Sequence, residues 1–310
     1  MLAKLYSKSS YLPFILSHLY LTIVIIVKIL EKAGFSGIDK LLEHLLLVIL
    51  INLLMNSYNS WINKSAKNDG INFIDRSIIH MFLFPVVFSF LPNEIVKTEI
   101  VIAIYFMNSA IFKFNLLLPK LKEIDLIKTG IIMSISIIII PYFFIYLLFM
   151  TIRILPSSNF TISKLIAINL PTVTTWFLVL TINKFLINFN FPYFINPDQK
   201  LYDNLIQDFE GWMIIAATIT SFLSLFFTNK KSLYRMERNT YFTRLAFFIA
   251  HIFVVIFIGA FEAFIVLINS IVYGLSLFIR RIKNPIYKEI FLATLLFLSI
   301  SRIYIAFDSI

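Results

Sequence analysis

The chain has 310 residues, of which 59% are hydrophobic and only 14% are charged. Soluble domains carry roughly a quarter charged residues, so this composition excludes an ordinary water-soluble globule. The formal net charge is +10, but the basic residues stand at the ends of apolar stretches and form no patch interleaved with aromatic side chains, so we expect no nucleic-acid partner. The chain contains no cysteine, which excludes disulfides, thiolate catalysis and cysteine-bound metals.

Long apolar stretches follow one another along the chain, most of them close to the ~20 residues that a helix needs to cross a bilayer. They run approximately over residues 11–30, 41–57, 77–92, 98–118, 126–155, 162–189, 211–228, 241–260, 262–280 and 287–306. This pattern predicts an all-α fold, a polytopic transmembrane helical bundle that forms a single integral membrane domain over residues 1–310. Lys28 to Glu31 follow the first stretch where a cleavage site would need small residues, so we expect an uncleaved first transmembrane helix.

The loops between the first stretches alternate in charge. Lys64 and Lys67 follow the second stretch, whereas Glu94 and Glu99 follow the third. Cytoplasmic loops of membrane proteins retain Lys and Arg, so we expect a cytoplasmic N-terminus and a periplasmic loop around the two glutamates. The many Ile, Phe, Asn and Lys residues are typical of an AT-rich bacterial genome, so the membrane we expect is the bacterial inner (cytoplasmic) membrane.

The stretch 126–155 decides the sidedness of everything that follows it. If it crossed the membrane once, the acidic loop 198–210 would lie inside the cell. The basic segments 230–244 and 280–288 would then lie outside, against the preference of Lys and Arg for cytoplasmic loops.

Pro141 stands in the middle of this stretch, and proline breaks or kinks a helix interior. Two short helices, 126–140 and 142–155, that enter and return would restore the charge rule, with about 10–11 membrane segments in all and a periplasmic C-terminus. A single helix kinked at Pro141 is the alternative. The amphipathic residues 198–212 predict a further helix along the periplasmic interface.

The first periplasmic loop carries the acidic residues that we single out as catalytic candidates, Glu31, Asp39 and Glu43. Asp39 could act as a general base on an acceptor hydroxyl, with Glu31 or Glu43 as an auxiliary group. These carboxylates could also hold a divalent cation beside a phosphate leaving group; otherwise no cofactor is evident. The spacing of Ser36 and Asp39 also fits a capping box at the start of the second helix, which is the structural alternative.

Two basic segments could bind anionic lipid headgroups, each residue near the surface contributing about 1 kcal/mol. Membrane lipids are therefore expected partners, although retention of these loops in the cytoplasm would explain the same charges. The residues concerned are Lys230, Lys231, Arg235, Arg238, Arg280, Arg281 and Lys283.

No metal site is predicted, because the four histidines have no metal-ligand spacing and HExxH is absent. We expect each histidine to pack between helices or to lie at the interface: His18, His44, His80 and His251. Of the charged residues, only Glu262, Lys184 and Arg302 fall where the membrane could bury them.

Five stretches carry a resemblance: Lys8-Ser9-Ser10 before the first helix, Asn52 in the second, Lys67-Asn68 after it, Asp125 to Gly130 opening the paired short helices, and the ending Arg280 to Phe291. In these stretches the chain resembles a family of flavobacterial-type polytopic inner-membrane proteins of similar length that has no assigned activity. The resemblance implies a fold and a compartment rather than a reaction.

The order of a first helix, an acidic periplasmic loop, several crossings and a short helix pair more distantly resembles the GT-C superfamily of polyprenyl-dependent glycosyltransferases. That resemblance implies an essential acid in the first periplasmic loop, the region of Asp39. The adjacent pair of aspartates found in many members is absent.

Two functions follow as hypotheses. The first is an enzyme-like protein that handles a polyprenyl-linked sugar or similar lipid at the periplasmic face. The second is a non-catalytic membrane subunit or scaffold of a cell-envelope complex, with another inner-membrane or envelope protein as its partner. A transporter is a third possibility, but the chain lacks the internal repeat and the midplane acid that would support it.

Overall fold

The structure is a computed structural model that describes residues 2–6, 11–33, 41–68, 79–91, 98–117, 122–155, 160–182, 209–226, 235–258 and 261–308. Every regular element within these residues is a helix, which confirms the all-α prediction. In chain order the helices are α1 (Leu2–Leu5), α2 (Tyr11–Ala33), α3 (Leu41–Asn68), α4 (Ile79–Ser89), α5 (Thr98–Leu117), α6 (Glu123–Ile139), a short 3-10 helix (Pro141–Phe143), α7 (Phe144–Ile154), α8 (Ile162–Ile182), α10 (Phe209–Phe226), α11 (Arg235–Ile258), α12 (Phe261–Arg281) and α13 (Pro285–Asp308).

Five helices of the described ranges are long and apolar enough to cross a membrane, so the chain is a polytopic helical membrane protein. These spans are Tyr11–Glu31, Leu41–Ser60, Ile162–Ile182, Phe264–Arg281 and Pro285–Asp308. Shorter apolar helices cover Ile79–Ser89, Pro141–Ile154, Gly211–Phe226 and Leu245–Ile256. Whether these shorter helices raise the number of membrane segments to the predicted value stays a prediction.

Some helix ends differ from the apolar stretches. α3 continues to Asn68, beyond the predicted end at 57, because its polar continuation contains no proline or glycine to end a helix. α11 likewise begins at Arg235, ahead of the apolar residues. Most of the predicted interfacial helix 198–212 lies outside the described residues; its last residues, from Phe209, form the first turn of α10.

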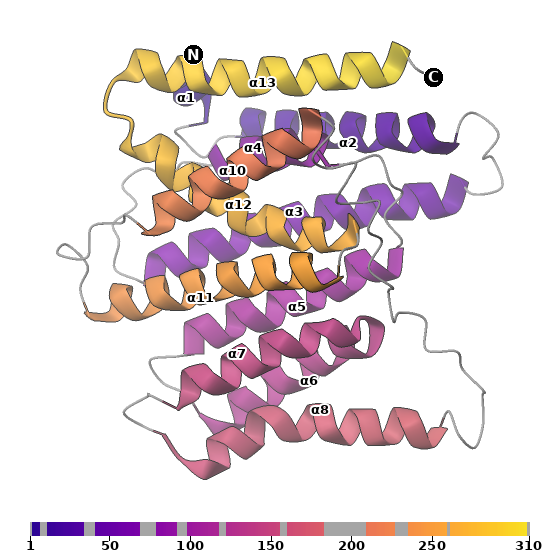
Figure 1. The fold of residues 1–310 in the computed structure, drawn as a ribbon, viewed down its shortest axis with the longest axis vertical. Coiled ribbons are helices and arrows are strands. Elements are labelled where there is room, and N and C mark those ends of the chain that lie inside the picture. The colour runs from indigo at the N-terminus through magenta and orange to yellow at the C-terminus, as the bar shows by residue number, and fades with distance from the viewer. Residues whose placement is uncertain are drawn as a thin grey trace. The chain divides into compact units, whose positions relative to one another are not determined.

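The chain divides into two compact units (Figure 1). Unit 1 comprises Met1–Thr98, Asp198–Lys230 and Gly259–Ile310, and unit 2 comprises Glu99–Pro197 and Lys231–Ile258. Unit 1 therefore contains α1 to α4, α10, α12 and α13. Unit 2 contains α6, α7, α8, α11 and all but the first residue of α5. The single integral domain over 1–310 stays a prediction.

The centre of unit 1 is α4, a helix whose eleven residues are all buried. It packs against α2, α3, α12 and α13. A helix that is apolar on every side must be surrounded by protein or lipid, and here the neighbouring helices surround it. α12 also packs closely on α10, because a Cβ on Gly274 would lie 2.5 Å from Cβ of Ser221 and 2.7 Å from its carbonyl oxygen.

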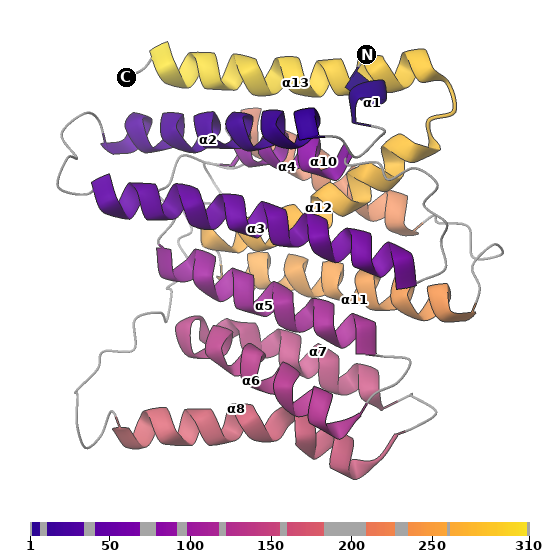
Figure 2. The same cartoon turned by 180° about the vertical axis from the view of Figure 1, so that it is seen from behind.

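α1 and the C-terminal end of α13 lie apart in unit 1. α1 lies at the start of α13, where the backbone N–H of Ala3 donates a 2.9 Å hydrogen bond to Glu289. The 24 residues of α13 then span about 36 Å at 1.5 Å per residue. Figure 2 shows α1 beside the first part of α13, with the last residues of α13 at the far end of that helix. The cytoplasmic N-terminus and periplasmic C-terminus stay predictions.

The predicted helix pair around Pro141 is confirmed in unit 2. α6 ends at Ile139, and Ile140 takes an extended conformation with φ −128° and ψ 95°. The 3-10 helix over Pro141–Phe143 turns the chain, and α7 begins at Phe144. The alternative of one kinked helix is therefore wrong, since the residue before proline leaves the helical region of backbone conformation.

Contacts between α6 and α8 show that the chain doubles back. Glu123 accepts a hydrogen bond from Ser163, and further along both helices the hydroxyl of Thr175 donates to Ser134 over 3.4 Å. These pairs advance together, so α6 and α8 run parallel and α7 must return the chain between them (Figures 1 and 2). Midway, Gly130 lets the α6 backbone meet the carbonyl of Ile168.

Candidate functional site

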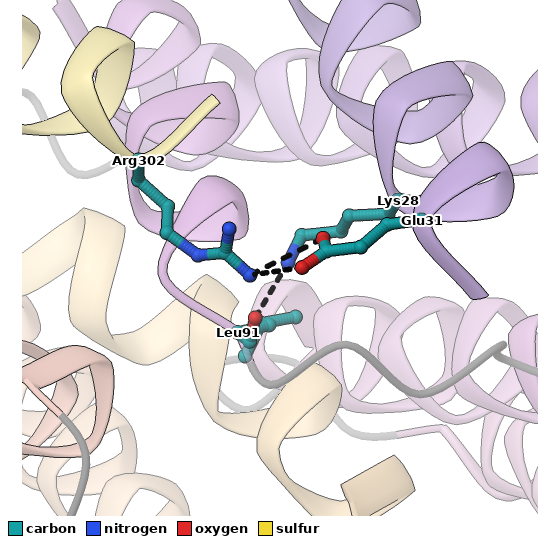
Figure 3. A network of polar contacts seen from close by, with 4 residues as sticks. All are labelled: Lys28, Glu31, Leu91 and Arg302. Atoms are coloured by element: carbon teal, nitrogen blue, oxygen red, sulfur yellow. Dashed lines mark hydrogen bonds and ion pairs between the residues drawn. The ribbon is translucent and has the colours of Figure 1, made fainter. Parts of the chain in front are cut away.

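A cluster of charged side chains joins the ends of α2 and α13 in unit 1 (Figure 3). Nη2 of Arg302 lies 3.2 Å from Oε1 of Glu31 and donates also to Oε2 over 3.3 Å. The Arg302 side chain is 10% exposed and that of Glu31 is 17% exposed. Lys28 stands one turn before Glu31 on α2. We call Lys28, Glu31 and Arg302 the charged cluster.

Lys28 connects this cluster to the end of α4. Its Nζ donates a 2.5 Å hydrogen bond to the carbonyl oxygen of Leu91, two residues beyond the helix. Carbonyl groups at the end of a helix lack intrahelical donors, and a positive charge there also suits the helix dipole. The ammonium group thereby fixes the C-terminal end of the central helix of unit 1 to α2.

Hydroxyl groups extend the polar contacts from the charged cluster along α13. Ser299, one turn before Arg302, is fully buried. Its Oγ is hydrogen-bonded to the hydroxyl of Tyr20 and, over 2.6 Å, to Oγ of Ser89. These three residues come from α13, α2 and α4: the two helices that form the charged cluster and the central helix that Lys28 contacts at its end. Polar side chains in a membrane helix bundle commonly join helices in this way.

The charged cluster lies near the ends of two candidate membrane spans. Glu31 is the last residue of the span Tyr11–Glu31, and Arg302 stands six residues before the end of the span Pro285–Asp308. Charges in membrane segments are costly to bury and usually face a partner or a functional cavity. Two cations and one carboxylate give the cluster a formal net charge of +1, which suits a phosphate group better than a metal ion.

The catalytic candidates have different outcomes. Glu31 is in the charged cluster, whereas Asp39 lies outside the described residues. Glu43 is exposed on the first turn of α3. α2 and α3 are antiparallel neighbours, joined by a 3.3 Å hydrogen bond from Asn52 to Thr22, so the end of α2 and the start of α3 lie at the same end of unit 1. Within the described residues no group of three His, Asp or Glu could hold a metal ion.

The lipid-binding candidates are described only in part. Lys230 and Lys231 lie outside the described residues, and for Arg235 and Arg238 the structure describes the helical backbone of α11. At the end of α12, Arg281 and Lys283 are exposed. Arg280 is half-buried, so it faces protein at least in part.

Two histidines are buried in helix packing, as expected of them. His80 on α4 is hydrogen-bonded through Nε2 to Oδ1 of Asn59 over 2.5 Å. In unit 2 the ring of His251 lies 5.2 Å from the ring of Tyr146, centroid to centroid. His18 bonds the carbonyl oxygen of Phe14 on its own helix.

The partnership of Arg302 with Glu31 was missed by the sequence reasoning, although a signal for it was present. Arg302 is the one charged residue between Phe291 and Phe307, and Lys28 and Glu31 are the charges of the first span. An arginine isolated in an apolar membrane helix is usually paired with a carboxylate, and few of the predicted spans contain a carboxylate.

No protein-family profile, curated protein or solved structure matches the chain significantly. The expectations drawn from resemblance therefore stay expectations.

Proposed function

We propose that this membrane protein handles a lipid-linked substrate, a polyprenyl-linked sugar or a similar phosphate-bearing lipid, at the end of unit 1 where α2, α4 and α13 end. The observation that supports this is the charged cluster of Lys28, Glu31 and Arg302, held at the end of a membrane span. A lipid phosphate lies at that depth when its chain is in the hydrocarbon core.

In this proposal the reacting groups come from the loop between α2 and α3. Asp39 acts as the general base on the acceptor, Glu43 at the start of α3 is the auxiliary carboxylate, and both carboxylates are ligands for a divalent cation. Glu31 is engaged by Arg302, which suits it to positioning better than to proton transfer. The end of unit 1 that carries these groups faces the periplasm of an inner membrane.

The catalytic part is tested by Asp39→Asn and Asp39→Ala. Each variant is expected to lower sugar transfer from a polyprenyl-linked donor by about 10²–10⁴-fold, the contribution of a positioned general base. Transfer of radiolabelled sugar in membranes, normalised to the amount of protein, is the measurement. Asp308→Asn, which removes an exposed carboxylate at the end of α13, is the matched control and keeps full activity.

Full transfer by both Asp39 variants, with the protein stably made, contradicts the enzyme proposal. A stoichiometric partner retained in mild detergent would then favour the alternative of a non-catalytic subunit or scaffold of a cell-envelope complex.

The orientation is tested with single cysteines, since the chain has none of its own. An impermeant thiol reagent added to intact cells is expected to label positions 39, 204 and 309 and to leave positions 65, 158, 233 and 284 unlabelled until the cells are lysed. The reverse pattern at positions 39 and 284 would show the opposite orientation and place the proposed site in the cytoplasm.

A further inference from the structure

The carboxylate of Glu31 on α2 pairs with Arg302 of α13, and a second cationic residue, Lys28, stands one turn before Glu31 on α2. Figure 3 shows the side chain of Arg302 approaching from α13 and the side chains of Glu31 and Lys28 approaching from α2. The Glu31 carboxylate therefore occupies the position beside Arg302 that the oxygens of a bound phosphate would take.

The ion pair itself has a geometry that a phosphate could improve. Both contacts run from the same Nη2 of Arg302, at 3.2 and 3.3 Å. Charge-assisted N–H···O bonds are usually 2.7–2.9 Å long, and arginine binds oxyanions best through two parallel bonds from two nitrogens. Glu31 comes from its own helix and does not attain that geometry.

We propose that Glu31 is a displaceable carboxylate that holds Arg302 until a phosphate group replaces it. The phosphate then lies on Arg302 and Lys28, and Glu31 turns toward the end of α2. This inference rests on the proposed function, because it names the phosphate as the group recognised and adds the carboxylate as its competitor. Hydroxyl donors of Ser299 and Tyr20 lie on the same helices, one or more turns deeper.

The direction in which Glu31→Gln changes the affinity for phosphate distinguishes a displaceable carboxylate from a purely structural ion pair. Glu31→Gln keeps the size of the side chain and removes the competing charge, so phosphate should bind more tightly. If Glu31 only helps α2 and α13 to pack, the same change loosens the packing and phosphate binding does not improve.

The experiment uses the full-length protein purified in detergent and two probes, dihexanoyl phosphatidic acid and inorganic phosphate, with affinity measured by calorimetry. Wild type is expected to bind the short-chain lipid, and Glu31→Gln to bind it about tenfold more tightly, which is one unit of log Kd. Arg302→Gln and Lys28→Gln should each bind about tenfold more weakly. Asp308→Asn, with the same loss of negative charge at an exposed site on α13, should match wild type.

The two probes distinguish the source of the phosphate. If the tightening by Glu31→Gln is seen with the lipid alone, the site takes a lipid headgroup; if it is seen equally with inorganic phosphate, the site takes the free ion, and both results support a displaceable carboxylate. Unchanged or weaker binding by Glu31→Gln overturns it. Should Glu31→Gln not fold, Glu31→Asp keeps the charge but shortens its reach, and an affinity no higher than that of wild type has the same meaning.

The displaceable carboxylate and the proposed enzyme function can fail independently, because the binding assay needs no turnover. Suppose that the Asp39 variants lose sugar transfer while Glu31→Gln binds phosphate with unchanged affinity. The proposed enzyme function would then stand, and the proposed displacement of Glu31 would be wrong.

Discussion

Arg302→Gln is expected to destabilise the protein by about 3 kcal/mol, since removing one partner of a buried ion pair leaves the other charge uncompensated. The Arg302 side chain is 10% exposed, and the side chain of its partner Glu31 is only 17% exposed. Water therefore cannot replace the guanidinium fully. Unfolding in detergent, followed by intrinsic fluorescence during a denaturant titration, measures the loss.

A double substitution tests whether the loss comes from the pair. Arg302→Gln combined with Glu31→Gln should be less destabilised than Arg302→Gln alone, because no charge is then left without its partner. Arg281→Gln, which removes an exposed arginine at the end of α12, is the control and should stay within about 0.5 kcal/mol of wild type. Equal losses for Arg302→Gln and Arg281→Gln would contradict the structural role of the pair.

Gly130→Ala is expected to destabilise unit 2 by about 1–3 kcal/mol or more, because an inserted methyl group must force the packing apart. A Cβ at this position meets the backbone carbonyl oxygen of Ile168 at less than van der Waals distance and lies 3.1 Å from Cγ of Pro171. A backbone atom inside α8 cannot move aside as the end of a side chain can. Thermal unfolding of the purified protein is the measurement.

The sign of this change is informative, because alanine favours a helix over glycine by about 1 kcal/mol. Without the contact between α6 and α8, Gly130→Ala would stabilise α6. Ile131→Ala, at the neighbouring exposed position of α6, controls for changes in the helix itself and should have a small effect. An increase in stability on Gly130→Ala would contradict the close packing of α6 against α8.

Local chemistry along the chain was enough to predict the helices and the break at Pro141. Runs of apolar residues must satisfy their backbone groups within a helix in a membrane, and proline removes a donor and restricts the residue before it. The sequence positions of α2, α5 and α12 therefore agree closely with the apolar stretches. Helix ends such as that of α3 at Asn68 were less accurate, because polar residues continue a helix once it has left the lipid.

Which side chains meet was decided only by the tertiary structure. Glu31 and Arg302 are 271 positions apart in the chain, and both were noticed in the sequence, but neither composition nor spacing links them. The central position of α4 and the need for glycine at 130 also depend on which helices become neighbours. Helix formation is local, because it depends on backbone hydrogen bonds and hydropathy. The pairing of helices depends on how similarly apolar helices pack together, and the sequence of a single helix does not specify its neighbours.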